Sequence, residues 1–275
     1  MSAADSLATV VQRNERTSRW RHGLLRQSGR WTAATGSILF GLLLWEVASR
    51  QVNPLFLPSP AQTWQAAIEL TQDGSLPEAV VASLQRILLG WVAGVLIGAP
   101  VGVLMGYFRP IRQMLDPYIE FFRFIPPIAF VTLAVIWMGP GEISKIALIF
   151  YTSVFIVALN TIAGVQAVSV LRLRAAASLG AGPLLTLLTV VVPSTVPYMV
   201  TGARIAMGNS FLTIVSAEIV SAQQGLGALI WTARNYGRTE WVFVGIITLG
   251  LLGFVIDRIL RFVVRATLKH YDVNV

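Results

Sequence analysis

Six long apolar runs constrain this chain of 275 residues more than any other feature. Each has about 20 residues or more, which is enough for a helix to cross a hydrocarbon core ~30 Å thick. Only 12% of the residues are charged, against about 25% in soluble domains. We therefore predict an all-α integral membrane protein with about six transmembrane helices, at roughly 32–50, 83–108, 118–139, 143–168, 194–222 and 241–264.

Lysine and arginine gather at alternate ends of the runs, and this predicts the orientation of the chain, because cytoplasmic loops carry the excess of positive charge. With the N-terminus inside, the cytoplasmic side holds fourteen: Arg13, Arg16, Arg19, Arg21, Arg26, Arg30, Arg109, Arg112, Arg172, Arg174, Arg258, Arg261, Arg265 and Lys269. The outside holds four: Arg50, Lys145, Arg234 and Arg238. Three more lie within or at the ends of the runs: Arg86, Arg123 and Arg204. We expect both termini in the cytoplasm, and this pattern explains the net charge of +8 without nucleic acid.

The chain before the second run divides into a tail, a first span and an outer segment. Residues 1–30 are polar and arginine-rich, and no small-residue cleavage site closes the apolar run after them. We therefore expect a cytoplasmic tail rather than a signal peptide. Three prolines within residues 54–60 forbid a continuous helix there. Residues 61–72 then show the two faces of a short amphipathic helix, with Trp64 suited to the outer membrane surface.

Motifs of an enzyme or of a cofactor site are absent from the sequence. The chain has no cysteine, which excludes disulfides and thiolate metal sites. No G-x-x-x-x-G-K-[ST] loop is present to hold nucleotide phosphates. The two histidines, His22 and His270, lie far apart in the charged tails. We expect a non-catalytic chain with no metal and no cofactor of its own.

Five glycines of the second run recur every four residues: Gly90, Gly94, Gly98, Gly102 and Gly106. Small residues at this spacing allow two helix backbones to approach closely in lipid. The pattern fits two interpretations. Ordinary packing between helices of one chain is favoured, and a face for a second copy of the chain is the alternative.

Charged residues inside apolar runs are candidates for a translocation pathway, because a charge in hydrocarbon costs about 2.5–3.5 kcal/mol on insertion scales. Arg123 lies three residues after Glu120, so an ion pair on one helix face is expected. Pro126 and Pro127 then break the helix inside a span, and broken helices are tolerated where they line a cavity. Arg123 to Pro127 is therefore a candidate pathway element, and a purely structural ion pair is the alternative.

The fifth run carries a second group of candidates. Asn209 and Thr213 share a sector of the expected helix, Glu218 follows them, and Arg204 precedes them. A polar stripe on an apolar helix favours a side that faces the pathway. A cluster of hydrogen bonds between helices explains the stripe equally well. Asn160 in the fourth run is a weaker candidate of the same kind.

The loop between the fourth and fifth runs carries a spaced pattern. It reads Arg-Ala-Ala-Ala-Ser-Leu-Gly over residues 174–180, followed after nine residues by Val-Val-Val-Pro over 190–193. Residues 168–180 have helical propensity, and Gly180 permits a sharp bend through a positive φ. Pro183 suits the first turn of a second helix. We expect a helix, a glycine turn and a second helix on the cytoplasmic surface.

The residues of this loop suit contact with a partner protein. Small side chains at Ala175, Ala176 and Ala177 allow close seating in a groove of the partner. Arg172 and Arg174 can reach acidic groups at the rim of that groove. An ordinary interfacial helix is the alternative.

Together these segments resemble the permease subunits of type I ATP-binding-cassette importers, in the nitrate/taurine/sulfonate branch. The resemblance is carried by residues 54–60, 124–127 ahead of 135–139, 174–193, and 197–204 leading to 217–218. It implies the type I permease fold with a core domain at 79–263. A first span with its outer segment at 31–78 precedes the core, and a cytoplasmic tail at 264–275 follows it. Arg174 departs from the family loop, which begins with Glu, and this puts in doubt only an ion pair that needs a carboxylate there.

The resemblance also implies the partners of the chain. They are a second copy of the chain in the bacterial inner membrane, two ATPase subunits that bind ATP and Mg inside, and a solute-binding protein outside. Closure of the ATPases would push on the loop and switch the permease between two access states. The coupling residues would be Arg172, Arg174, Ala175, Ala176, Ala177, Gly180 and Pro193. The pathway candidates are Arg123, Pro126, Pro127, Asn160, Arg204, Asn209, Thr213 and Glu218.

A small anion is the expected substrate, with taurine or another sulfonate favoured. Nitrate, nitrite, bicarbonate, and aromatic or pyrimidine solutes are alternatives for the same machinery. A stand-alone secondary transporter or channel is the alternative from another class. Such carriers often show paired broken helices in two internal repeats, and the sequence shows no such repeat.

Overall fold

The computed structural model describes residues 35–221 and 223–268. The predicted arginine-rich tail at 1–30, and His270 and Lys269 near the C-terminus, lie outside the described residues. The chain divides into two compact units, Met1–Gln62 and Thr63–Val275. The regular structure of the described residues is helical throughout, as the sequence predicts.

The first unit contains a helix over residues 35–51 followed by the proline-rich turn. The indole nitrogen of Trp45 donates to the carbonyl of Pro58 at 2.9 Å, which folds the turn back on the helix. A reciprocal pair of hydrogen bonds starts helix α2 (Pro60–Gln72). The Ser59 hydroxyl accepts from the Gln62 amide, and the Gln62 side chain accepts from the Ser59 amide, which is a capping box. The predicted short helix at 61–72 is confirmed.

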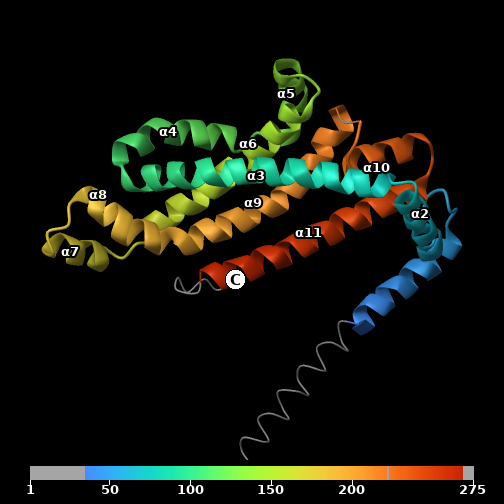
Figure 1. The fold of residues 1–275 in the computed structure, drawn as a ribbon, viewed down its shortest axis with the longest axis horizontal. Coiled ribbons are helices and arrows are strands. Elements are labelled where there is room, and N and C mark those ends of the chain that lie inside the picture. Colours follow the sequence, from blue (N-terminus) through green and yellow to red (C-terminus); the bar gives the residue numbers. More distant parts are fainter. Residues whose placement is uncertain (1–34, 222, 269–275) are drawn as a thin grey trace, which may run out of the picture. The chain divides into compact units, whose positions relative to one another are not determined.

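The second unit holds the other helices, and Figure 1 shows their arrangement. In it α3, α6 and α9 pack side by side. The short helices α7 and α8 lie at one end of this group, and α10 lies at the other. The bounds are α3 Ser75–Tyr107, α4 Arg109–Phe122, η1 Pro127–Phe130, α5 Val131–Met138, α6 Glu142–Gln166, α7 Val170–Ser178, α8 Pro183–Thr186, η2 Leu187–Val191, α9 Val192–Ser221, α10 Leu226–Asn235 and α11 Thr239–Thr267.

The described residues contain four helices long and apolar enough to cross a membrane: α3, α6, the continuous helical stretch Pro183–Ser221, and α11. A fifth span results if α4 and the η1–α5 segment are counted together, although they are bent by 88° at their break. The predicted first span is helical over its described residues, 35–51.

Three boundaries differ from the sequence prediction. The third predicted run, at 118–139, is broken at Pro126 and Pro127 as expected, but its first helix, α4, begins at Arg109 rather than near residue 118 and ends at Phe122. Helix α3 begins at Ser75 rather than near residue 83, since proline and an acidic residue are tolerated in a first helical turn. Helix α10 was not predicted, and α11 continues to Thr267 into the predicted tail at 264–275.

The five glycines of α3 form the seam on which α6 packs. A Cβ atom built on any of them would lie only 2.4–2.7 Å from an atom of α6. Three of the glycines face carbonyl oxygens at this distance: Gly90 faces that of Ile146, Gly98 that of Val154 and Gly102 that of Ala158. Because backbone cannot be repacked as a side chain can, α6 sits where it does only if these positions lack a side chain. The glycines are thus occupied within the chain, and the alternative of a dimer face built on them is wrong.

The seam predicts that alanine is harmful at one glycine and harmless at another. Gly102→Ala places a methyl group 2.6 Å from the Ala158 carbonyl oxygen, and overpacking of this kind costs about 1–3 kcal/mol. Gly208→Ala in α9 is the matched control, since nothing lies within 4 Å of its added methyl and alanine favours a helix. We expect a lower midpoint of thermal unfolding in detergent for Gly102→Ala and no loss for Gly208→Ala. Equal midpoints for both variants would contradict the seam.

Candidate functional site

The loop between α6 and α9 contains the predicted helix and glycine turn, but its second helix runs without a break into α9, so the fifth span begins at Pro183 rather than near residue 194. The Ser169 hydroxyl accepts from the Arg172 amide and caps the start of α7. At its end Gly180 has φ +76°, and the Ala181 and Gly180 amides donate to the carbonyls of Ala176 and Ala177. This is a Schellman motif, which needs a left-handed residue after the helix. Glycine therefore stops α7 and turns the chain toward α8.

A short π-helical stretch, Leu187–Val191, joins α8 to α9. It lies directly before Pro193, whose ring nitrogen cannot donate to the carbonyl four residues earlier. Widened turns of this kind are frequent at functional sites. The Arg172 guanidinium donates to the Ser194 hydroxyl at 3.2 Å and ties α7 to the start of α9. Pro193 was recognised in the sequence, but the widened turn before it was not predicted.

Four of the predicted coupling residues line one surface groove of about 570 Å³: Arg172, Ala175, Ala176 and Pro193. Leu179 and Leu185 complete its apolar wall, and Leu179 is 88% exposed. Ala177 and Arg174 lie exposed beside the groove. Leu179, Leu184 and Leu185 are each more than half exposed, and a group of exposed apolar side chains marks a site of contact with a protein or with lipid.

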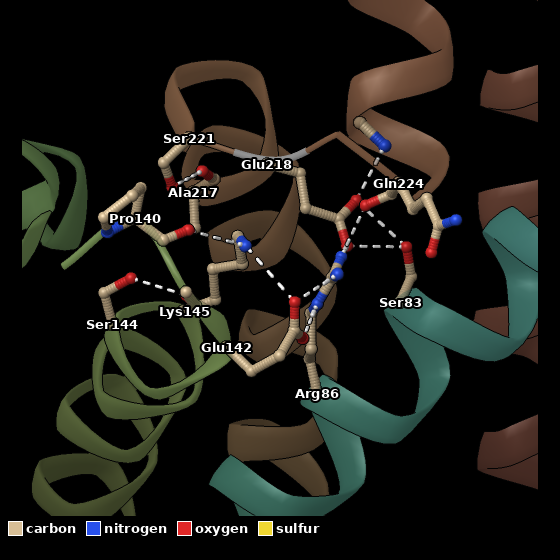
Figure 2. A network of polar contacts seen from close by, with 12 residues as sticks. Ser83, Arg86, Pro140, Glu142, Ser144, Lys145, Ala217, Glu218, Ser221 and Gln224 are labelled. Atoms are coloured by element: carbon tan, nitrogen blue, oxygen red, sulfur yellow. Dashed lines mark hydrogen bonds and ion pairs between the residues drawn. The ribbon is translucent and has the colours of Figure 1, made fainter. Parts of the chain in front are cut away.

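A second group of polar residues lies at the other end of the helices, and Figure 2 shows it. Arg86 of α3 donates to Glu218 of α9 at 2.7 Å and to the backbone carbonyl of Gln224 at 2.7 Å. It also forms a two-point ion pair with Glu142 of α6, with one contact at 2.8 Å. Glu218 is completely buried and Arg86 is 4% exposed. One guanidinium therefore links three helices and the loop before α10.

The carboxylate of Glu218 has further donors. Ser83 donates to it at 2.8 Å, and the amide of Gly227 donates at 2.8 Å. Gly225 has φ +129°, and a Cβ there would lie 2.4 Å from the Glu218 carboxyl carbon. The glycine lets the backbone wrap around the buried charge. The chain thus satisfies Glu218 from several directions, as a buried charge requires.

Sequence reasoning named Glu218 but not its partners. Arg86 lay inside an apolar run, and that position was the available signal. Lys145, which the charge count placed outside, is 3% exposed; it donates to the carbonyl of Pro140 at 3.2 Å and to Glu142 at 3.4 Å. The pairing needed the tertiary structure, because Arg86 and Glu218 are 132 residues apart in the chain.

The other candidates of α6 and α9 make hydrogen bonds within or between these helices. Thr213 pairs with Thr152 of α6 at 3.0 Å. Asn209 and Asn160 each donate to a carbonyl one turn earlier in their own helix. Arg204 forms an ion pair with Asp257 of α11 at 2.9 Å. For Thr213, Glu218 and Arg204 this geometry favours interhelical contacts over contact with a solute.

The break between α4 and η1 keeps its polar groups in contact. Arg123 pairs with Glu120 at 2.7 Å, as predicted, and lies over the ring of Phe124. The Tyr151 hydroxyl of α6 donates to the Phe122 carbonyl at 2.5 Å and lies 3.2 Å from that of Ile125. Carbonyls freed by a break inside a membrane must find such a donor. Tyr151 thus stabilises the helix break by hydrogen bonding to the carbonyls that the break leaves without a partner in the helix.

Groups of three or more acidic, histidine or cysteine side chains that could hold a metal ion are absent from the described residues. The α7–α8 loop with its exposed groove and the buried ion network thus lie at opposite ends of α3, α6 and α9.

Comparisons with known proteins agree with this arrangement. The taurine transport system permease protein TauC of Escherichia coli is 38% identical over 255 residues, which cover 90% of this chain and 92% of TauC. The bicarbonate transport system permease protein CmpB of Synechococcus elongatus is 32% identical over 85% of this chain and 88% of CmpB. The nitrate import permease protein NrtB of Leptolyngbya laminosa is 30% identical over 84% of this chain and 85% of NrtB.

A solved structure of the MetNI methionine ABC transporter in inward-facing conformations has the same fold. The TM-score is 0.58 at 21% identity, over 68% of this chain and 95% of that chain. A family model matches residues 94–269, against the core expected at 79–263. The chain therefore belongs to the family of binding-protein-dependent transport system inner membrane components.

Proposed function

We propose that the chain is the permease subunit of an ATP-driven importer that moves a small anion into the cytoplasm by alternating access. Two copies of the chain would form the pathway, with two ATPase subunits inside and a solute-binding protein outside. Both termini would be cytoplasmic, in agreement with the distribution of lysine and arginine. The single observation that carries the proposal is the α7–α8 loop, which presents an exposed groove away from the buried ion network.

The loop suits a mechanical contact with an ATPase. Ala175 and Ala177 leave room for close approach, and Leu179 offers an apolar anchor. The Arg174 side chain makes no hydrogen bond or ion pair with the described residues, so its charge is free for an acidic rim on the partner. The Schellman turn and the Arg172–Ser194 contact connect the loop to α9, so a push on α7 would reach a membrane helix.

Arg123, Pro126 and Pro127 are the strongest pathway candidates, since the break they define is exposed and carries a cation. We propose that Glu218, Thr213 and Arg204 act differently, by holding the outer ends and faces of the helices during the cycle. Asn160 and Asn209 are half-buried and remain candidates for the wall of the pathway.

Taurine or another sulfonate is the substrate that we favour. The sequence identity to TauC is greater than that to CmpB and NrtB. Taurine, bicarbonate and nitrate, after which these three relatives are named, are all small and carry an anionic group. Nitrate, nitrite and bicarbonate are alternatives for the same machinery, as are aromatic and pyrimidine solutes.

Reconstitution tests the function directly. The chain is purified together with a candidate ATPase and a candidate binding protein from the same organism and placed in liposomes. Uptake of labelled taurine, nitrate and bicarbonate is then measured with and without ATP. We expect ATP-dependent uptake of one anion that requires the binding protein. Failure to assemble with the ATPase, or uptake that needs no ATP, would support a stand-alone transporter instead.

The glycine turn predicts a contrast between two exposed glycines that are two residues apart. Gly180 has φ +76°, whereas Gly182 is extended, and neither has an atom within 4 Å of an added Cβ. A β-branched residue in the left-handed region costs about 1–2 kcal/mol or more. We expect Gly180→Val to lower binding-protein-stimulated ATP hydrolysis of the reconstituted complex about five- to thirtyfold. Gly182→Val is the control and should couple normally; equal activity of the two would rule out the bend as a coupling element.

The ion network predicts a loss of stability rather than of substrate affinity. Glu218→Ala leaves Arg86 buried with one fewer carboxylate, and removal of one partner of a buried pair costs about 3–5 kcal/mol. We expect Glu218→Ala to lower the thermal midpoint of the purified permease. The double variant Arg86→Leu/Glu218→Leu should lose less stability than the single variants Arg86→Leu and Glu218→Leu lose in sum.

Glu46→Ala removes an exposed ion pair with Arg50 and is the control with little expected effect. If Glu218→Ala keeps its full stability but loses uptake, Glu218 contacts the solute and the structural role is wrong.

A further inference from the structure

Helix α4 has two exposed faces of opposite character. Its polar residues all fall within an arc of about 100° on a helix of 3.6 residues per turn: Arg109, Arg112, Gln113, Asp116, Glu120 and Arg123. Beside them Met114, Tyr118 and Phe121 form an apolar face, each 62–65% exposed. The apolar face suits lipid or an apolar protein surface, and the polar face suits neither.

The third face of α4 packs on the membrane helices. Ile119 is buried with Met105 of α3 and Ile162 of α6, and Ile111 and Leu115 pack against the same cluster. Helix α4 therefore lies along α3 and α6 instead of lying across their ends (Figure 1). An interfacial helix on the membrane surface would not make these contacts.

The far end of α4 lies deep along α6. The Phe122 carbonyl accepts from Tyr151, which precedes the end of α6 at Gln166 by fifteen residues, or about 22 Å of helix axis. A hydrocarbon core is ~30 Å thick. Asp116 and Glu120 therefore belong to the part of the helix that runs inside the membrane.

The charged side chains on the polar face form ion pairs with one another but remain partly exposed. Arg112 lies 3.6 Å from Asp116, and Arg123 lies 2.7 Å from Glu120. These side chains are 35–53% exposed, so the described residues do not cover them. Three arginines oppose two carboxylates on this face, which leaves it with a positive excess.

We propose that the polar face of α4 is the wall of a water-filled, cytoplasm-facing passage for a small anion, with Arg123 as its innermost cation. Charged side chains at membrane depth face the interior of a bundle or a watery cavity, because lipid cannot solvate them. A row of paired charges with a positive excess attracts an anion without trapping it, since each arginine keeps a competing carboxylate. The passage ends at the helix break before Pro126, which the hydrogen bond from Tyr151 to the Phe122 carbonyl stabilises.

This inference rests on the proposed function only for the identity of the anion. The existence of water along α4 is independent of the ATPase and of the binding protein. The two parts are therefore tested by different measurements.

Accessibility of single cysteines tests the passage, and the chain contains no native cysteine to remove. Asp116→Cys and Glu120→Cys report the polar face, and Met114→Cys and Phe121→Cys are matched controls on the exposed apolar face of the same helix. Inverted membrane vesicles carrying the full chain are treated with a charged methanethiosulfonate, which reacts with a hydrated thiolate. We expect labelling of the first pair to be at least about tenfold faster than that of the second, because thiolates form in water and not in lipid.

Two results would overturn the passage. Equal rates on both faces would mean that α4 lies in water or in lipid on all sides. Slow labelling at both polar positions, together with disulfide-linked dimers of the same variants under oxidation, would mean that the polar face packs against a second copy. Assembly of each variant with the ATPase shows that it is folded, and wild-type uptake in the same vesicles tests the proposed function separately.

The charge of the reagent tests the anion. With Asp116→Cys as reporter, the rate of the anionic 2-sulfonatoethyl reagent is divided by that of the cationic 2-trimethylammonioethyl reagent, and the ratio is compared with that of a free thiol. We expect a raised ratio that falls severalfold when Arg123→Gln is added, because one positive charge near the passage is lost. A ratio unaffected by Arg123→Gln would leave a water-filled passage but overturn its preference for anions.

Discussion

The close approach of α3 and α6 along the glycine seam is the contact on which the other features depend. Without side chains at these glycines, the backbones come near enough for a Cβ to clash with carbonyl oxygens of the neighbour. A similar device joins α6 to α9, since Gly202 faces Asn160 and Gly164 faces Tyr198. In lipid, where no hydrophobic force drives helices together, such contacts supply the packing energy. The seam brings Arg86 within reach of Glu142 and creates the surface on which α4 lies.

The ion network and the α7–α8 loop make the two ends of the helices physically different. At one end the buried Arg86 holds α3, α6 and α9 together through the buried Glu218 and the half-exposed Glu142. A buried pair gains little net stability over apolar packing, but loss of one partner is expensive, so the network disfavours any rearrangement that separates these ends. At the other end the loop is exposed and joined to α9 through one turn and one arginine. A transporter that is pushed from one side needs this asymmetry.

Helix α4 and the break after it connect these ends. Its packed face is fixed by Ile119, its break is held by Tyr151, and its polar face is left uncovered by the described residues. Broken helices occur at membrane depth where they are buried in protein or line water. The geometry of α4 thus relates the proposed substrate pathway to the same helices that the glycine seam brings together.

The sequence by itself determined the membrane class, the broken third span, the loop with its glycine turn, and the family. The first three follow from local rules, which are apolar length, proline geometry and the positive φ that Gly180 adopts. The family follows from the resemblance of spaced motifs to those of known permeases. The sequence also contained the glycine repeat, but not the identity of the facing helix, because one period fits packing within the chain or between copies.

Only the tertiary structure decided which partners distant residues have. Arg86 and Glu218 lie far apart in the chain, and no local pattern relates them; they meet because α3, α6 and α9 pack through small residues. The widened turn before Pro193 and the uncovered face of α4 likewise depend on how helices sit against each other. Spacing along a chain specifies faces of helices, and only packing specifies which faces meet.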